Sequence, residues 1–318
     1  MSSTLPNLKP MSTGDILDYA IRIYRQNFVG LVTIVGIVTL PFFVLQAIGY
    51  ALVLLRDGTF SAPSTLQSNP ALPLPLLLLS LVLTILLGFF AIFKLGATAS
   101  FVSERFLGHR ITVWQAYKNA FGHGLSLFVD ALLLVLAYVG VLSLLIGVVF
   151  VPVLLGMGLI SSGGNNLGSG GAPAGAGVVI CLFVLLIPTI MSLLYLYAHW
   201  TFWSQAIMLE NYSGTGALGR SWKLVKGTFW RVLLFNVLLT IFPWVISFSA
   251  SAAVSWGSVF LPNLGLRLIL QLVVSGIINV IIAPLQYAAL TILYYDLRIR
   301  KEGFDLQMQL PSLTLRYL

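Results

Sequence analysis

Residues 29–55 read VGLVTIVGIVTLPFFVLQAIGYALVLL and contain no charged side chain. A helix crosses the hydrocarbon core of a bilayer, which is about 30 Å thick, with about 20 apolar residues. The run is longer than that minimum, and a core helix of a soluble domain needs no such length. We therefore predict that this segment is a membrane-spanning helix.

Five further segments of the same kind follow along the chain. Together the six cover about 29–55, 76–102, 125–157, 176–206, 232–256 and 268–295. Strands of a membrane barrel would be about ten residues long with alternating polarity, so strands are disfavoured. The predicted fold class is all-α, a polytopic membrane protein with six transmembrane helices.

The composition excludes a soluble globular protein. Charged residues make up 8% of the 318 residues, whereas an ordinary soluble domain contains about 25%. The net charge of +8 does not indicate nucleic-acid binding, because the basic residues lie at the ends of apolar segments. The single cysteine, Cys181, can form neither an internal disulfide nor a cysteine-rich metal site.

The basic residues also predict the orientation of the chain. The connections 56–75, 158–175 and 257–267 contain two of the 17 basic residues, Arg56 and Arg267, which leaves 15 on the opposite side. Loops rich in lysine and arginine remain in the cytoplasm. Both termini are therefore expected in the cytoplasm, and the three basic-poor connections outside.

An amphipathic helix is predicted before the first span. Ser12 and Asp15 have the spacing of a capping box, with aspartate in place of the usual glutamate or glutamine. Apolar residues then recur at intervals of four, three and four, and form one stripe of Leu17, Ile21, Tyr24 and Phe28. Such a helix can lie in the headgroup plane before the chain enters the bilayer.

The same pattern returns twice. One copy of the stripe is Leu218, Trp222, Val225 and Phe229, and a shorter copy is Trp114, Tyr117 and Phe121. The chain is predicted to contain three units, 12–108, 109–214 and 215–306, within a single membrane domain and followed by a cytoplasmic tail, 307–318. Each unit would be an interfacial helix and a helical hairpin. Aromatic and basic anchors that occur at any membrane interface are the alternative explanation.

Polar residues inside the predicted spans are candidate functional positions, because a charge at mid-helix costs about 2.5–3.5 kcal/mol on insertion. The predicted intramembrane polar cluster is Lys94, Asp130, His199, Asn236, Asn279 and Gln286. It would line an inner-leaflet cavity for a polar headgroup, an ion or a proton. The alternatives are an Asp130–Lys94 structural pair, amides that bond between helices, and Lys94 reaching from near the cytoplasmic end of its span to the headgroups.

Basic residues on the predicted cytoplasmic side are candidate contacts to anionic lipid headgroups. These residues are Arg22, Arg25, Lys118, Lys223, Lys226, Arg298, Arg300 and Lys301. No catalytic constellation, cofactor motif or metal-ligand spacing is visible in the sequence. The expected partner is the lipid bilayer, nucleic acid is not expected, and protein partners stay open.

Three motifs carry a resemblance to a known family. They are GDILDYAIRIYRQNF at 14–28, ALGRSWKLVKGTFW at 217–230 and LYYDLRIRKEGFDL at 293–306. These resemble the opening, central and closing motifs of bacterial proteins named for a glycerophosphoryl diester phosphodiesterase membrane domain. The resemblance implies a multi-pass protein of the bacterial plasma membrane with a poorly defined function.

The family name does not imply catalysis by this chain. Phosphodiesterases of that kind use a soluble barrel with clustered His, Glu and Asp around a divalent cation, and this chain has no room for one. His109, with its neighbours Gly108 and Arg110, resembles part of such an active site, but no acidic cluster follows it in the sequence.

The predicted function is therefore non-enzymatic, as a lipid-interacting scaffold or an envelope-homeostasis factor. The alternative is a transporter or permease component with an inner-leaflet polar cavity, for which internal repeats and broken helices are expected.

Overall fold

The computed structural model describes residues 10–57, 73–162, 187–257 and 264–304, and every regular element in these ranges is an α-helix. Five long helices are α2 (Phe28–Asp57), α3 (Pro73–Phe106), α5 (Gly124–Ser162), α9 (Phe229–Gly257) and α10 (Leu264–Glu302). Four short helices are α1 (Thr13–Gln26), α4 (Val113–Gly122), α7 (Trp203–Glu210) and α8 (Thr215–Val225). A further helix covers 187–200.

Four of the long helices are long and apolar enough to cross a membrane. The qualifying stretches are Phe28–Ile48, Gly124–Leu144, Phe229–Gly257 and Ile269–Glu302. A helix pairs all its backbone polar groups internally, as the bilayer interior requires. The predicted all-α class is confirmed for the described residues, and the protein has membrane-compatible helices.

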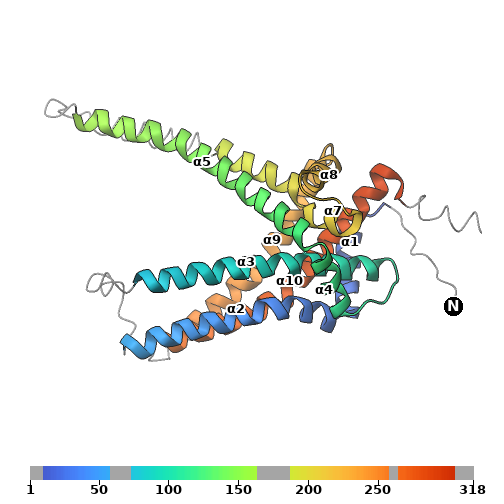
Figure 1. Cartoon of the computed structure of the whole chain (residues 1–318), viewed down its shortest axis with the longest axis horizontal. Coiled ribbons are helices and arrows are strands. Elements are labelled where there is room, and N and C mark those ends of the chain that lie inside the picture. Colours follow the sequence, from blue (N-terminus) through green and yellow to red (C-terminus); the bar gives the residue numbers. More distant parts are fainter. Residues whose placement is uncertain (1–9, 58–72, 163–186, 258–263, 305–318) are drawn as a thin grey trace, which may run out of the picture.

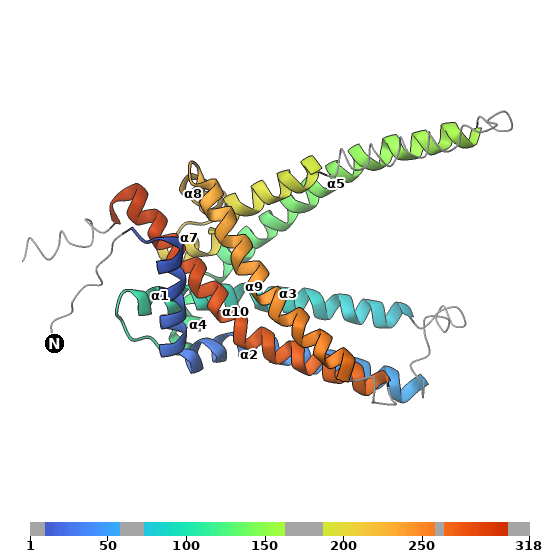
Figure 2. The same cartoon turned by 180° about the vertical axis from the view of Figure 1, so that it is seen from behind.

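The short helices gather at one end of the molecule, and the long helices extend from it (Figure 1). Helix α10 lies at the centre, where it packs against α1, α2, α3 and α9. Helices α2, α3 and α10 contact one another and form a three-helix group. Helix α5 and the helix at 187–200 diverge from this group, and the view from behind shows the same separation (Figure 2).

Helix α1 begins with the predicted capping box. The Asp15 N–H donates to Ser12 Oγ at 3.2 Å, and the Ser12 N–H donates to the Asp15 carboxylate at 2.9 Å. The Ser12 side chain, which has the largest effect, and the Ser12 N–H lower the pKa of the Asp15 carboxyl by hydrogen bonding to it. Helix α4 begins in the same way with Thr112 and Gln115, a signal present in the sequence that the motif search did not use.

In the amphipathic helices α1 and α8, the face that packs against the rest of the protein is offset from the predicted apolar stripe. Each residue of this face comes one position before a stripe residue. In α1 the buried residues are Ile16, Ala20 and Ile23, whereas Ile21 and Phe28 of the stripe are exposed. In α8 the same register recurs, with Ala217, Ser221 and Leu224 buried, and Val225 of the stripe is buried as well. Small residues in the middle of each face, alanine and serine, allow close packing. Leu17 and Tyr24 of the predicted stripe are partly buried against the core, and Ile21 and Phe28 stay exposed.

Candidate functional site

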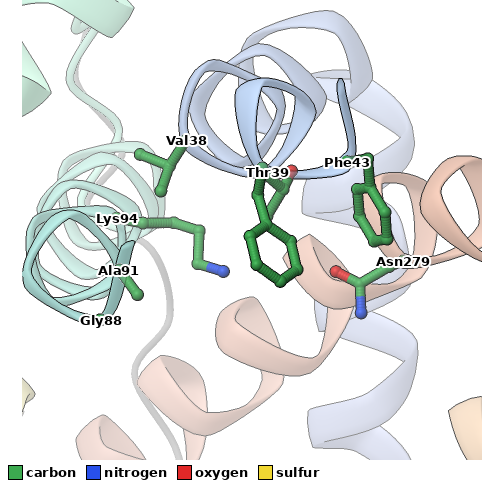
Figure 3. Close-up of a pocket in the computed structure, with 8 residues that line it drawn as sticks. Val38, Thr39, Phe43, Gly88, Ala91, Lys94 and Asn279 are labelled. Atoms are coloured by element: carbon green, nitrogen blue, oxygen red, sulfur yellow. The ribbon is translucent and has the colours of Figure 1, made fainter. Parts of the chain in front are cut away.

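A pocket of about 370 Å³ lies between α2, α3 and α10 (Figure 3). Most of its lining is apolar, and three polar side chains contribute to it. The lining residues are Val38, Thr39, Phe42 and Phe43 from α2, Gly88, Ala91 and Lys94 from α3, and Asn279 from α10. The pocket volume lies within the range of about 300–1,000 Å³ that is usual for small-molecule sites.

Lys94 brings a positive charge into this apolar surrounding. The residue is only 8% exposed, and its ammonium group points from α3 across the pocket towards α2 and α10 (Figure 3). Its Nζ lies 5.7 Å from the centre of the Tyr287 ring, which is within reach of a cation–π contact. No hydrogen bond or ion pair joins this ammonium to another residue in the described part of the chain. The group keeps three donors available.

Thr39 and Asn279 add neutral polar groups. The Thr39 hydroxyl donates to the Val35 carbonyl at 2.7 Å, so its oxygen remains an acceptor towards the pocket. The Asn279 amide is exposed, and it projects into the pocket beside Phe43 (Figure 3). One cation, one amide and one hydroxyl therefore share a mostly apolar cavity.

The pocket lies well inside the helical group. Thr39 is eleven residues after Phe28, the first residue of α2, which is about 16 Å at ~1.5 Å per residue. Half the thickness of the hydrocarbon core is about 15 Å. Lys94 of α3 lines the same pocket as Thr39. Its ammonium lies 5.7 Å from the centre of the Tyr287 ring, and the alternative that Lys94 reaches the headgroups stays a prediction.

The alternative Asp130–Lys94 pair is not formed. A Cβ atom on Gly96 would lie 2.8 Å from Leu127 Cδ1, so this side of α3 touches α5. Asp130 lies about one turn after Leu127 in α5 and is therefore near the Gly96 side of α3. Lys94 lies about 200° around α3 from Gly96, so it is on the other side of that helix. Asp130 is fully buried, and neither of its carboxylate oxygens has a hydrogen-bond partner.

The other predicted members of the polar cluster lie elsewhere. The Nδ1 atom of His199 is 2.9 Å from the Tyr195 carbonyl, and the ring of His199 lies 4.2 Å from that of Trp222. The Asn236 side chain donates to the carbonyl of Val232 at 2.9 Å, one turn back in α9. Gln286 lines a smaller apolar pocket between α1, α9 and α10. Of the six predicted residues, Lys94 and Asn279 share a pocket, and the other four are dispersed.

The sequence analysis missed an ion-pair cluster that joins α7, α8 and α10. Arg220 donates to Glu210 at 2.7 and 2.9 Å and also to Glu302, while Arg298 pairs with Glu210 at 3.0 Å. The Tyr294 hydroxyl donates to the same Glu210 carboxylate. The hydrogen bond to Glu302 is the main reason that the pKa of Arg220 is raised. The sequence signal for this cluster was the position of Glu210 and Glu302 shortly after the ends of two predicted spans.

A second cluster ties the start of the described chain to α9 and α10. Asp296 accepts a hydrogen bond from the Met11 N–H at 2.7 Å and pairs with Arg231 at 2.8 Å and Arg300 at 3.0 Å. The two arginines each donate to the Met11 carbonyl at 2.6 Å. Asp296 is fully buried, and its carboxylate is surrounded by donors.

These clusters divide the eight predicted headgroup contacts into two groups. Arg298 and Arg300 pair with carboxylates, and Lys301 donates to the backbone carbonyls of Lys223 and Lys226. These three side chains have partners within the protein. The remaining five make no ion pair in the described part of the chain, namely Arg22, Arg25, Lys118, Lys223 and Lys226. All five are exposed, as are Arg300 and Lys301.

The described part of the chain is all-helical, and four of its long apolar helices are compatible with a membrane protein. The chain belongs to the family described as domain of unknown function DUF7847, whose model matches residues 11–297. No curated protein and no solved structure matches the chain. The matched range begins at Met11 and ends one residue after Asp296, so its two ends meet in the second ion-pair cluster.

Proposed function

We propose that this chain is a non-enzymatic membrane protein that engages anionic lipid at its cytoplasmic face. Its role would be that of a lipid-interacting scaffold or an envelope-homeostasis factor. The observation that carries the proposal is that α1, α4 and α8 gather at one end of the molecule (Figure 1). Four of the five exposed basic residues named above lie in these helices, and the fifth, Lys226, directly follows α8.

The finer topology is part of the proposal. Six spans would be formed by the five long helices together with the helix at 187–200, in three hairpins with both termini in the cytoplasm. Two observations support the repeat. The buried faces of α1 and α8 share one register, and Thr39 and Thr240 donate to the carbonyls four residues back at 2.7 and 2.8 Å. The motif resemblance supports two further parts of the proposal. These are that the chain lies in the plasma membrane of a bacterium and that it is related to proteins named for the phosphodiesterase membrane domain.

Aromatic side chains support the assignment of this end to the membrane interface. Trp114 in α4 is 76% exposed and Trp230 in α9 is 69% exposed. Tryptophan is enriched where the hydrocarbon meets the headgroups. Each basic residue near an anionic surface contributes about 1 kcal/mol of attraction. The exposed tryptophans and basic residues together suit a surface that selects anionic lipid.

Lipid selectivity of the full chain tests the proposal. The protein is placed in nanodiscs of phosphatidylcholine, and energy transfer from its tryptophans to dansyl-labelled phosphatidylglycerol or phosphatidylcholine is compared. Phosphatidylglycerol should be enriched about fivefold near the protein. The enrichment should fall on changing the five exposed basic residues to glutamine, and on raising the salt concentration. Arg267→Gln is the control, because Arg267 lies near the start of α10, at the end that is predicted to be external. Equal enrichment in all variants would contradict the proposal.

A second candidate function, a permease component, is favoured by the pocket around Lys94. A pocket among helices that contains polar side chains is where a transporter would bind its solute. The test is flux of an anionic solute into proteoliposomes. A rate above that of protein-free vesicles, lost in Lys94→Met, would support this candidate, and equal rates would reject it.

A further inference from the structure

We infer that the pocket between α2, α3 and α10 binds the anionic head of a single-chain amphiphile, with Lys94 as its counterion. The ligand class is a carboxylate or a phosphate on an alkyl chain. This inference deepens the second candidate function and rests on it, because it names the ligand of the same pocket.

The charge of Lys94 is the first step of the argument. The ammonium points into the pocket without an acidic partner in the described ranges, and the ion pairs of Glu210, Asp296 and Glu302 are made with arginines. A buried unpaired charge is costly unless a counterion and hydrogen bonds compensate it. An oxyanion of a ligand would supply both through charge-assisted hydrogen bonds.

The neutral polar groups fit the same head. The Asn279 amide can donate to an oxyanion, and Thr39 can accept a hydrogen bond from a protonated phosphate or a carboxylic acid. Both lie on the side of the pocket opposite to Lys94 (Figure 3). A head bound here would therefore touch all three helices.

The rest of the lining selects an amphiphile over a small hydrated ion. Val38, Phe42, Phe43 and Ala91 offer no replacement for the water that an inorganic anion would lose on entry. An alkyl chain would instead gain from contact with these side chains.

A second hollow next to the first offers room for the chain. It has a volume of about 710 Å³ and lies between α2, α3 and α4. Val38 lines both hollows. The second hollow is lined by aliphatic and aromatic side chains, among them Phe90, Phe93 and Trp114. A cationic pocket beside an apolar hollow matches the two parts of an anionic amphiphile.

Gly88 keeps the pocket open. A Cβ atom at this position would meet nothing within 4 Å, so a larger side chain would project into the pocket without a clash. Glycine in a helix interior lowers helix stability relative to alanine. A substitution that fills the pocket should therefore leave α3 intact, which makes Gly88 a suitable position for a test.

The test measures binding of radiolabelled dodecyl phosphate to the full chain in phosphatidylcholine nanodiscs. We expect saturable binding that palmitate displaces, and that dodecanol and inorganic phosphate do not. Lys94→Met should weaken binding about thirtyfold or more, because it removes one partner of a buried charge pair. Lys94→Arg should retain part of the affinity. Arg110→Gln, which removes an exposed basic residue between α3 and α4, should bind like the unchanged protein.

A second variant separates loss of the site from loss of the fold. Gly88→Leu should abolish binding while thermal unfolding stays unchanged. Gly140→Leu is its matched control, since Gly140 is also helical and has open space around it, but it does not line the pocket. Binding in Gly88→Leu equal to that in the control would overturn the inference.

The competitors and the flux assay distinguish the remaining outcomes. Displacement by inorganic phosphate would show that the ligand is a small anion and would overturn the inferred amphiphile as ligand. Displacement by dodecanol would show that binding needs no anionic head and would overturn the inferred role of Lys94 as counterion. Saturable binding that requires Lys94, without flux, would support the inference and reject the permease. Flux that requires Lys94, without binding of either amphiphile, would reject the inference and leave the permease standing.

Discussion

At the scale of single residues, two buried aspartates show how the surroundings decide the role of a charge. Asp130 and Asp296 are both fully buried. Asp296 is surrounded by Met11, Arg231 and Arg300, whereas the carboxylate oxygens of Asp130 have no hydrogen-bond partner. The sequence pattern selected Asp130 because it interrupts an apolar run. Asp296 escaped notice because it lies among basic residues at the end of a helix.

The two aspartates therefore predict opposite effects of the same substitution. Asp130→Asn should leave the free energy of unfolding unchanged or raise it by up to about 3 kcal/mol, the insertion cost of a mid-helix carboxylate. Asp296→Asn should lower it by about 1.5–3 kcal/mol, because the partly exposed Arg231 and Arg300 lose their charge-assisted hydrogen bonds to a buried carboxylate. Unfolding by SDS titration in mixed micelles measures both. A large loss of stability in Asp130→Asn would mean that its carboxylate has a partner that this account lacks.

The candidate site was predictable only in part from the sequence. Lys94 and Asn279 were identified because polar residues are rare within apolar runs. Their shared pocket depends on the register between α3 and α10 and on the direction of each side chain around its helix. The direction of the Lys94 side chain around α3 also separates it from Asp130, although the sequence pattern had suggested that the two residues could form a pair. Hydropathy contains no information on helix rotation when the whole circumference is apolar.

At the scale of elements, the break at Thr201 and Phe202 shows what a hydropathy pattern misses. The apolar segment 176–206 contains no proline or glycine at this point, yet the chain turns between the helix at 187–200 and α7. Ser221 of α8 bridges the break. Its hydroxyl donates to the His199 carbonyl at 2.6 Å and accepts from the Phe202 N–H at 3.1 Å. A tertiary contact, rather than a local signal, accounts for the turn.

Removal of this hydroxyl should destabilise the protein. Ser221→Ala leaves a buried carbonyl and a buried N–H unpaired, each of which costs about 1–3 kcal/mol. We expect a loss of about 2 kcal/mol or more in the same SDS titration. Ser275→Ala is the matched control, because its hydroxyl donates to the Gln271 carbonyl within its own helix. The control should lose about 0.5 kcal/mol or less, and equal losses would contradict the role of Ser221.

Local signals did predict the start of α1. The capping box of Ser12 and Asp15 is confirmed, because it depends on residues three apart in sequence. The face on which α1 packs was offset by one residue from the predicted stripe. Leu17 and Ile21 are more apolar than Ala20, but Ala20 permits the close approach of α1 to α10. The small size of Ala20 therefore mattered more than side-chain hydrophobicity in deciding which face of α1 is buried.

At the scale of the whole molecule, composition was the strongest predictor. A chain with 8% charged residues builds long apolar helices, and the structure contains four that suit a membrane. The divergence of α5 from the group of α2, α3 and α10 was not predictable (Figure 1). The ion pairs of Glu210 and Asp296 join α7, α8, α9 and α10 and include no residue of α5.

The central claim is a six-span protein whose basic end and both termini face the cytoplasm. Its most direct test is labelling of single cysteines by a membrane-impermeant maleimide in intact cells, after Cys181→Ser removes the only native thiol. Ser68→Cys, Ser169→Cys and Ser258→Cys should be labelled from outside. Ser2→Cys, Ser213→Cys and Ser312→Cys should react only after permeabilisation. Labelling of Ser213→Cys in intact cells, or protection of Ser169→Cys, would contradict the account.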